Sequence, residues 1–556
     1  MEMKGSPEIM SIARVAAFHT YDALTAELRR IEQARPDLIR MAAIGKTRAG
    51  RDLWCLEAAN REAATPVAFR PGLLVIANMH AVELAGSCQA LHFLSHLAEH
   101  YDDDAAVRRL LDEQVVYVIP RIAIDGADHI LAGGWRVRSR HIEARVRNAP
   151  YPSDLNGDGK VLKMRWPSPT GGYRLSTKDP RLVVPRRPED AEGPFYELAD
   201  EGPIHEWDGG RVSGSQPDCD FNRNFPAADW RPTPWLPEAG ASAHGAYPLS
   251  EPETRAVVDF VLAHPNIAAA ADFHTGNPAV FYPRQTIKGS ARHAADAELI
   301  ERMGRRAEAV TGWPLLSSYV ELRTGVRQSE TAGGAKDWLY ERLGVPVLLF
   351  EMGMFYNYLG FTTQDYFGLG DRHAEETGLA LLAAHDADPT IGLFTEWTPF
   401  DHPQLGPVEI GGWNTVPWSN PPLKKDMEAA CDKGTRFLLE FAQWRSRLQI
   451  TALTAEPLGG GLFLLKAHVA NMGTLPTCLT EQGREAFQGD DPTVELAGDI
   501  ACVTGRMNQR LGHLAAHGGN ARLEWVIRAQ PGTPVAVTVT SRRGAYAQAR
   551  LELPGR

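Results

Sequence analysis

Three largely apolar segments of the chain each end at a residue that can bind a metal or act as a base. Residues 72–79 lead into His80, residues 267–273 lead into His274, and the segment from Val345 leads into Glu351. Apolar segments of this length, set between helical stretches, are typical of buried strands in an α/β sheet. Because ligands and chemistry in such sheets lie at the carboxyl ends of the strands, these side chains are expected to meet at one edge.

The two imidazoles and Glu83, three residues after His80, form a donor set that suits a catalytic zinc ion. A histidine at a strand end and a glutamate in the next turn can bind one ion, and His274 would be the distant third ligand. The H-x-x-E pattern alone is not specific, because His96 and His373 begin the same pattern. Those two lie in polar helical contexts, whereas His80 directly follows a predicted buried strand.

The composition limits the classes of protein that need to be considered. A chain of 556 residues predicts two or more domains, and 44% hydrophobic with 23% charged residues indicates a globular protein. The net charge of −11 without a long basic run argues against a nucleic-acid partner. No segment approaches the roughly 20 apolar residues of a membrane span. The start of the sequence lacks an apolar signal segment, so a cytoplasmic location with six free cysteines is expected.

The composition and the hydrophobic periodicity of the sequence change along the chain. Residues 150–248 are rich in Pro, Gly, Asp and Arg, and such a long excursion usually borders an active site. Beyond a Pro/Gly/Trp-rich stretch near residue 400, residues 424–444 have the spacing of an amphipathic helix. Short alternating strands then predict a β-sandwich. These strands are expected at 448–453, 461–469, 523–529 and 535–540.

The motifs around the apolar segments resemble those of the carboxypeptidase A-like zinc metallocarboxypeptidases over about residues 15–395. They follow one another in the family's order. The matching segments are Asn78–Glu83 with the H-x-x-E pair, 214–225 with D-x-N-R-N-F, 250–254 with S-E-P-E-T, Asp272–His274, 333–338, and Phe350–Glu351. The resemblance implies an α/β fold with a central mixed β-sheet flanked by helices, to which the sequence adds a C-terminal all-β sandwich. The expected division is a catalytic domain at 1–400, a connector with a helix at 401–445, and the sandwich at 446–556.

The resemblance also implies roles for the residues. His80, Glu83 and His274 would hold one zinc ion, and Glu351 would take a proton from the attacking water and pass it to the leaving amine. General chemistry agrees, since zinc polarises a scissile carbonyl and a nearby carboxylate serves as base and then as acid.

Further positions concern the substrate. An arginine is expected to stabilise the developing oxyanion, and in residues 135–139, which occupy the place of the family's arginine segment, Arg138 is favoured over Arg136. Asn222 and Arg223 match the pair that holds a substrate's terminal carboxylate, which an arginine fork binds through two parallel hydrogen bonds.

Some positions differ from the family or have two interpretations. The family's phenolic tyrosine would fall near Ser329, and the arginine often found inside the H-x-x-E motif is Val82 here. Lys336 lies where the residue that selects the substrate side chain falls. A cation there would favour an acidic side chain, and the alternative is a solvent-facing lysine before Asp337.

Asp154, Asn156 and Asp158 imitate the first half of a calcium loop, but Arg165 stands at the twelfth position, where a glutamate is needed. An Asp/Asn/Gly turn and a partial calcium site with remote ligands therefore both remain open.

The sequence as a whole predicts a zinc metallocarboxypeptidase that hydrolyses an amide bond next to a carboxylate-bearing residue, with a possible preference for acidic C-terminal residues. One alternative is a deacylase or amidase acting on N-acyl amino acids or cell-wall peptides. A second is a binding protein with a vestigial zinc site. The expected partner is a peptide or N-acyl amino acid, neither nucleic acid nor a membrane, and the oligomeric state stays open.

Overall fold

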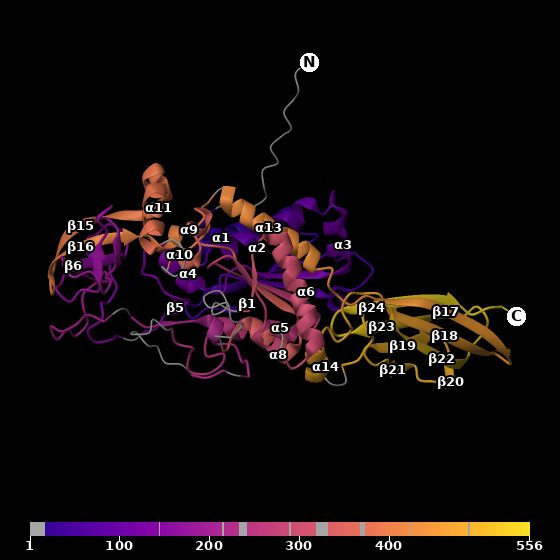
Figure 1. Cartoon of the computed structure of the whole chain (residues 1–556). Coiled ribbons are helices and arrows are strands. Elements are labelled where there is room, and N and C mark those ends of the chain that lie inside the picture. The colour runs from indigo at the N-terminus through magenta and orange to yellow at the C-terminus, as the bar shows by residue number, and fades with distance from the viewer. Residues whose placement is uncertain are drawn as a thin grey trace, which may run out of the picture.

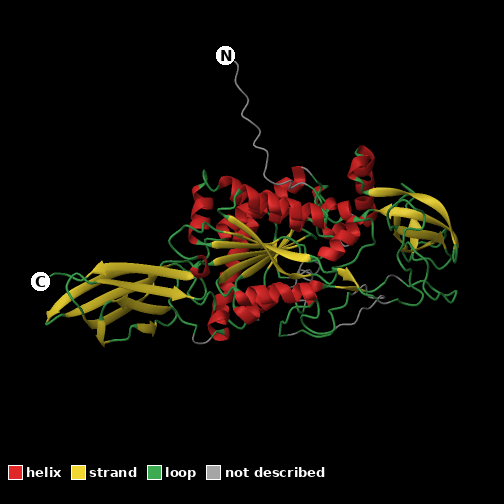
Figure 2. Cartoon of the chain, turned by 180° about the vertical axis from the view of Figure 1, so that it is seen from behind, coloured by secondary structure: helices red, strands yellow, loops and turns green. Residues whose placement is uncertain are grey.

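The computed structural model places a helix-covered central sheet between two smaller β-structures (Figures 1 and 2). The C-terminal sandwich lies at one end of the molecule, and a six-stranded sheet lies at the other. The structure describes residues 17–143, 145–213, 216–228, 230–232, 242–287, 291–317, 332–366, 373–423, 425–487 and 490–555.

The central sheet has eight strands in the order β1-β2-β4-β3-β11-β14-β12-β13. Strands β4, β3, β11 and β14 run parallel to one another, and antiparallel neighbours at β2 and β12 make the sheet mixed, as predicted. Every residue of β3 and β11 is buried, which explains why these strands appear in the sequence as continuous apolar runs. The strands are β1 (Ile39–Lys46), β2 (Asp52–Ala58), β3 (Gly72–Ala77), β4 (Val115–Ile119), β11 (Ile267–His274), β12 (Ala279–Phe281), β13 (Leu315–Leu316) and β14 (Val347–Glu351).

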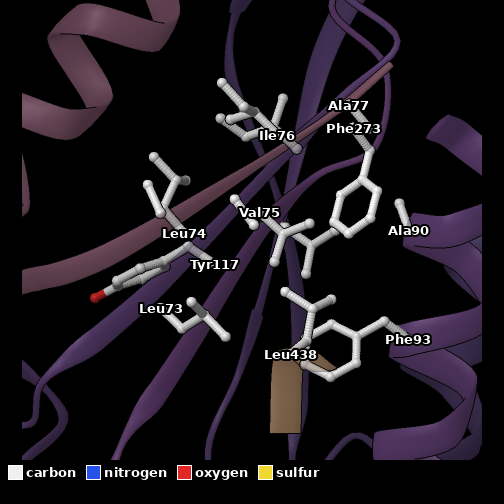
Figure 3. Close-up of a cluster of buried hydrophobic side chains, with 14 of the residues drawn as sticks. Leu73, Leu74, Val75, Ile76, Ala77, Ala90, Phe93, Tyr117, Phe273 and Leu438 are labelled. Carbon is white, nitrogen blue, oxygen red and sulfur yellow. The ribbon is translucent and has the colours of Figure 1, made fainter. Parts of the chain in front are cut away.

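Helices cover both faces of this sheet (Figure 2). Helix α2 packs on β3 and β11 and is covered in turn by α1 and α13, whereas α5 contacts β1 and α8 contacts β14. Figure 3 shows the α2 side of the core, where Phe93 of α2 and Leu438 of α13 lie beside β3 side chains such as Val75. The helices are α1 (Tyr21–Ala34), α2 (Ala85–His100), α3 (Ala105–Glu113), α4 (Ile124–Leu131), α5 (Pro252–Ala263), α6 (Ala294–Thr311), α8 (Ala335–Leu343), α9 (Phe355–Tyr358), α10 (Thr363–Tyr366), α11 (Ala374–Ala387), α12 (Thr415–Trp418), α13 (Lys425–Phe441) and α14 (Glu481–Ala486).

The C-terminal part of the chain is an all-β sandwich, which confirms the predicted fold class. Its two four-stranded antiparallel sheets have the orders β17-β18-β22-β20 and β21-β19-β23-β24, and they enclose a core that includes Leu465, Trp525 and Val537. The strands are β17 (Leu448–Gly459), β18 (Leu462–Asn471), β19 (Thr493–Gly498), β20 (Ala501–Thr504), β21 (Asn508–Arg510), β22 (Gly519–Arg528), β23 (Pro534–Ser541) and β24 (Ala545–Glu552).

The sandwich and the segment that carries α14 dock on the amino ends of the central strands. Gly544 abuts Pro71, immediately before β3, where an added Cβ on Gly544 would lie 2.3 Å from the Pro71 Cα. The Thr480 hydroxyl donates a hydrogen bond to the Gly344 carbonyl at 2.7 Å, three residues before β14. The buried guanidinium of Arg543 donates to the Leu343 carbonyl. The sandwich therefore lies at the edge of the sheet opposite to His274 and Glu351.

The six-stranded sheet, in the order β15-β16-β6-β9-β7-β8, was not predicted. Its strands are short, and β6 pairs with β16 although Met164 and Ile410, which are register partners, lie far apart in the sequence. Most of the sheet is an insertion between β5 (Arg140–His141) and β10 (Asp218–Cys219), which pair with each other. The strands are β6 (Lys163–Pro167), β7 (Tyr173–Leu175), β8 (Val183–Pro185), β9 (Tyr196–Asp200), β15 (Phe394–His402) and β16 (Gly406–Trp413).

Strand β15 crosses the domain boundary expected at residue 400. None of the described helices is both long and apolar enough to cross a membrane.

Candidate metal centre

A strained turn at the end of β3 presents His80. Asn78 has φ 51°, a left-handed conformation that few residues other than glycine and asparagine adopt readily. Its side-chain amide donates to the His80 carbonyl at 2.6 Å, and its Oδ1 accepts from the Ser87 hydroxyl at 3.0 Å. These bonds fix the direction in which the chain leaves the sheet and place His80 and Glu83 before the start of α2.

His274 and Glu351 lie side by side at the carboxyl ends of β11 and β14. They are register partners in this parallel pair, so their side chains lie on the same face of the sheet. The Met352 N–H donates to the His274 carbonyl at 3.0 Å, which ties the two strand ends together. Glu351 is buried, with 6% of its surface exposed. The structure thus brings together the side chains that the sequence predicted to meet at this edge.

Three donors converge at this point. His80 Nδ1 lies 2.8 Å from Glu83 Oε1, and His274 Nδ1 lies 2.8 Å from Glu83 Oε2 and 3.1 Å from His80 Nδ1. Donors bound to zinc at ~2.0–2.1 Å in a tetrahedron are about 3.3 Å apart, so shifts of a few tenths of an ångström would complete the site. In the described part of the chain, these three residues form the group whose donor atoms all lie within 4.8 Å of one another.

A carboxylate faces the far nitrogen of each imidazole. His80 Nε2 lies 3.1 Å from Asp220 Oδ1, and His274 Nε2 lies 3.0 Å from Asp272 Oδ2. Carboxylates in this position orient a metal-binding histidine and favour the tautomer in which Nδ1 is free to bind the ion. The His80–Asp220 contact is a hydrogen bond, whereas Asp272 approaches His274 at ion-pair distance. This arrangement fits zinc better than the three donors alone. The sequence analysis missed both roles, although Asp272 and His274 are two residues apart on a strand and therefore share a face.

Neighbouring positive charges lower the pKa values of Glu83 and Asp220. Burial raises the pKa of Glu83, but the two imidazoles outweigh it and hold that pKa below its usual value. Burial likewise raises the pKa of Asp220, but Arg223, His80 and Arg138 bring it well below normal. Both carboxylates are therefore ionised at neutral pH, as a cation site requires.

The two candidate arginines have different surroundings. Arg138 is engaged, because its Nη1 lies 3.4 Å from Glu83 Oε1 and its Nε lies 3.3 Å from Asp220 Oδ2. Arg136 is exposed, and within the described residues no hydrogen bond or ion pair is recorded for its guanidinium. The charges of Arg138, Asp218 and Glu83 act on Arg136. Arg136 is thus near the centre with its donors unused.

The segment of Asn222 and Arg223 borders the same centre. Asn222 is buried, and its Oδ1 accepts from the Ala335 N–H at 2.9 Å, where α8 begins. The Arg223 guanidinium donates only to the neighbouring Asn222 carbonyl among the bonds recorded for described residues. Asn224 anchors the segment, because its side chain bonds Thr254 and Ser250 of the S-E-P-E-T motif.

Lys336 is not the solvent-facing lysine considered as the alternative. It is buried, with 8% of its surface exposed, and its Nζ lies 3.1 Å from Asp337 Oδ2. The Ser329 position, where the family tyrosine was expected, lies outside the described residues. Val82, in place of the family arginine, is buried.

Of the two interpretations of residues 154–158, the partial calcium site is not supported. The Asp154 carboxylate accepts hydrogen bonds from the backbone N–H groups of Gly157, Asp158 and Gly159, as in an Asx-type turn. The buried Glu201 holds the same loop by accepting from Leu155 N–H. Local backbone donors thus use the oxygens that calcium would need, and the interpretation as a turn explains the motif.

The fold and the site define an α/β protein with a His2Glu group suited to a metal ion at the carboxyl edge of a mixed sheet, the one such group found among the described residues. A model of the zinc carboxypeptidases (Peptidase_M14) matches residues 24–368, which is more than half of the chain. The chain therefore belongs to the zinc carboxypeptidase family, and the predicted resemblance is confirmed. Residues 447–552 match a domain of unknown function (DUF8731).

Individual relatives are distant. The zinc carboxypeptidase of Saccharothrix mutabilis subsp. capreolus is 28% identical over 123 residues, which cover 21% of this chain and 28% of that protein. Carboxypeptidase A4 of Mus musculus is 21% identical over 326 residues, 58% of this chain and 60% of that protein. The chain thus spans less than two thirds of either relative. The structure of carboxypeptidase A from Helicoverpa armigera has a TM-score of 0.41 and 16% identity, covering 68% of this chain and 76% of that one.

Proposed function

We propose that this chain is a zinc-dependent metallocarboxypeptidase, which hydrolyses the amide bond next to the carboxylate-bearing terminal residue of a peptide. The observation that carries the proposal is the convergence of His80, Glu83 and His274, with Glu351 beside His274 on the next strand. Zinc held by these three residues supplies a Lewis acid that polarises the scissile carbonyl.

Glu351 is the proposed base. It takes a proton from the attacking water, whose oxygen bonds to the carbonyl carbon, and delivers that proton to the amine as the carbon–nitrogen bond breaks. Its burial at the strand end keeps the carboxylate in a site of low dielectric, where its charge acts strongly on the reacting groups.

Arg136 is the proposed donor to the oxyanion, in preference to Arg138. A group that stabilises charge in the transition state must have donors free for it, and Arg138 already contacts Glu83 and Asp220. Arg138 instead positions the ligand carboxylate and Asp220. The proposal thus prefers Arg136, whereas the sequence analysis favoured Arg138.

Asn222 and Arg223 are proposed to bind the terminal carboxylate of the substrate. The Arg223 guanidinium can offer a planar pair of donors to a carboxylate. Its position is held by Asn222, which bonds to the first residue of α8. Replacing Arg223 by Lys should therefore raise KM more than it lowers kcat, because the bidentate contact is lost but the charge is kept.

Lys336 is proposed to set the preference for the substrate side chain. Its charge is largely balanced by Asp337 at 3.1 Å, so an acidic substrate side chain has to compete with Asp337 for the ammonium group. We therefore expect a preference for terminal Glu or Asp of only about two- to fivefold, the range of a weak ion pair.

The test is hydrolysis by the zinc-loaded full chain of three matched substrates: a blocked dipeptide with a free terminal carboxylate, the same dipeptide amidated at that end, and an N-acyl amino acid. The proposal predicts cleavage of the first and little of the second. Faster turnover of the N-acyl amino acid would instead indicate a deacylase. Stoichiometric zinc binding with no turnover of any substrate would indicate a binding protein.

A further inference from the structure

A large recess lies between the central fold and the six-stranded sheet. Its volume is about 1040 Å³, and its walls come from α4, α9, the end of α11 and the segment that leads into α13. In Figure 1, α4 and α9 lie between the central sheet and the strands β6, β15 and β16. None of the residues proposed to hold the metal or bind the substrate lines it. The recess is therefore separate from the candidate metal centre.

The walls are mainly apolar. Side chains of Ile130, Leu131, Phe355, Leu359 and Val416 face the space. Pockets for small molecules typically have volumes of ~300–1,000 Å³ and mainly apolar walls with a few polar groups. The recess is close to the upper limit of this range, which suits a small molecule.

Most polar groups on the wall are already bonded within the protein. The Lys160 ammonium donates to the Thr395 hydroxyl at 3.1 Å. The Asp388 carboxylate accepts from the backbone N–H and the hydroxyl of Thr390. The Asn414 amide donates to the Gly392 carbonyl. These hydrogen bonds hold the three groups in place on the wall of the recess.

Asp426 is different. It lines the recess from the first turn of α13, and among the described residues no hydrogen bond or ion pair is recorded for its carboxylate. A carboxylate in the first turn of a helix is favourably placed, because the N-terminus of a helix attracts negative charge. Its charge also acts on Tyr358, another residue of the wall. An unpaired carboxylate beside an apolar surface attracts a ligand with a cationic group.

We propose that this recess is a second binding site, and that its ligand is a small apolar molecule carrying one amine. The apolar body contacts α4 and α9, and the ammonium pairs with Asp426. Helix α9 lies between the recess and the strand that carries Glu351, because the Tyr358 hydroxyl donates to the carbonyl of Met352, the residue after Glu351. The proposal does not depend on the proposed peptidase activity.

Calorimetric titration of the full chain tests the proposal without any peptide substrate. The probes are decylamine, decanol and decanoate, which share a ten-carbon body and differ in charge, each kept below the concentration at which it forms micelles. We expect one decylamine per chain, bound more tightly than decanol, with decanoate the weakest. Asp426→Asn should weaken decylamine binding about two- to fivefold, the range for a partly exposed ion pair, and leave decanol unchanged.

Two bulky substitutions test the location. Ala132 and Ala387 are exposed residues on the recess wall, so Ala132→Trp and Ala387→Trp should fill space without disturbing the core. Each should weaken decylamine binding by at least about tenfold. Ala383→Trp is the matched control, since Ala383 is exposed on the same helix as Ala387 but does not line the recess.

Three results would overturn the proposal: unchanged binding in both wall variants, a loss of binding in the control as large as in the wall variants, or decanoate binding as tightly as decylamine. The conservative Asp426→Asn variant keeps the proposal testable if a tryptophan variant fails to fold.

Discussion

Replacing Asp272 by Asn tests whether the carboxylates behind the histidines matter for metal binding. Asp272 is fully buried, and its Oδ2 lies 3.0 Å from His274 Nε2. Asn keeps the shape but removes the charge that holds the proton on Nε2. Loss of such a partner typically lowers metal affinity ~10- to 100-fold, about 1.4–2.7 kcal/mol. Because this pair is excluded from solvent, we expect the upper half of that range, about 30- to 100-fold.

The measurement is zinc affinity by competition with a chromophoric chelator on the folded full chain, with circular dichroism to confirm folding. Asp259→Asn is the control, since Asp259 is an exposed acid on α5 with no recorded partner among the described residues. Asp220→Asn, behind His80, should show a loss of similar size. A zinc affinity of Asp272→Asn within about twofold of the parent would refute the reasoning that the buried carboxylate orients His274.

Four further predictions follow from individual residues. Glu351→Gln should keep zinc binding but lower kcat at least ~100-fold in a peptidase assay, because the base is lost; full activity would exclude Glu351. Lys336→Ala should remove the weak preference for acidic terminal residues in a paired-substrate assay; an unchanged ratio would exclude that role. Burial raises the pKa of Glu253 from 4.5 to about 6. A carboxyl group with a raised pKa in the folded state contributes its full stability below pH 4.5 and loses that contribution as the pH rises through about 6. Glu253→Gln should therefore be more stable than the parent by about 2 kcal/mol at pH 7.5 and equal at pH 4, measured by urea unfolding. Gly344→Ala should lower the melting temperature far more than Gly360→Ala. Both glycines have positive φ, but only at Gly344 would a Cβ meet backbone, 2.1 Å from the Gly483 Cα on α14.

The convergence of the candidate ligands could be predicted because they follow strands that are buried on both faces. Such strands leave continuous apolar runs in the sequence, and the parallel register then brings His274 beside Glu351. The choice between Arg136 and Arg138 could not be made in this way. Both residues fall in one short segment, and only the tertiary contacts of Arg138 with Glu83 and Asp220 distinguish them.

The six-stranded sheet could not be predicted for a related reason. Its strands have three to nine residues, and they are separated by Pro- and Gly-rich turns, so they give little periodicity. One partner of β6 is the nearby β9, but the other is β16, which lies beyond the whole central sheet in the sequence. Local pattern cannot reveal a pairing over such a separation, whereas the sandwich was predicted because its long strands alternate apolar and polar residues.

The central sheet separates the site from the sandwich. The proposed metal ligands lie at the carboxyl ends of β3 and β11, whereas the sandwich and the segment that carries α14 contact Pro71 and Gly344 at the amino ends of β3 and β14. The eight residues of β11 at ~3.3 Å each span about 25 Å. The sandwich of the same chain therefore cannot contribute a side chain to the metal centre. The insertion that forms most of the six-stranded sheet begins at β5 and ends at β10, beside Arg138 and Asp220. Substrate selection beyond the terminal residue should therefore depend on that insertion, whereas the sandwich should affect the stability of the folded chain.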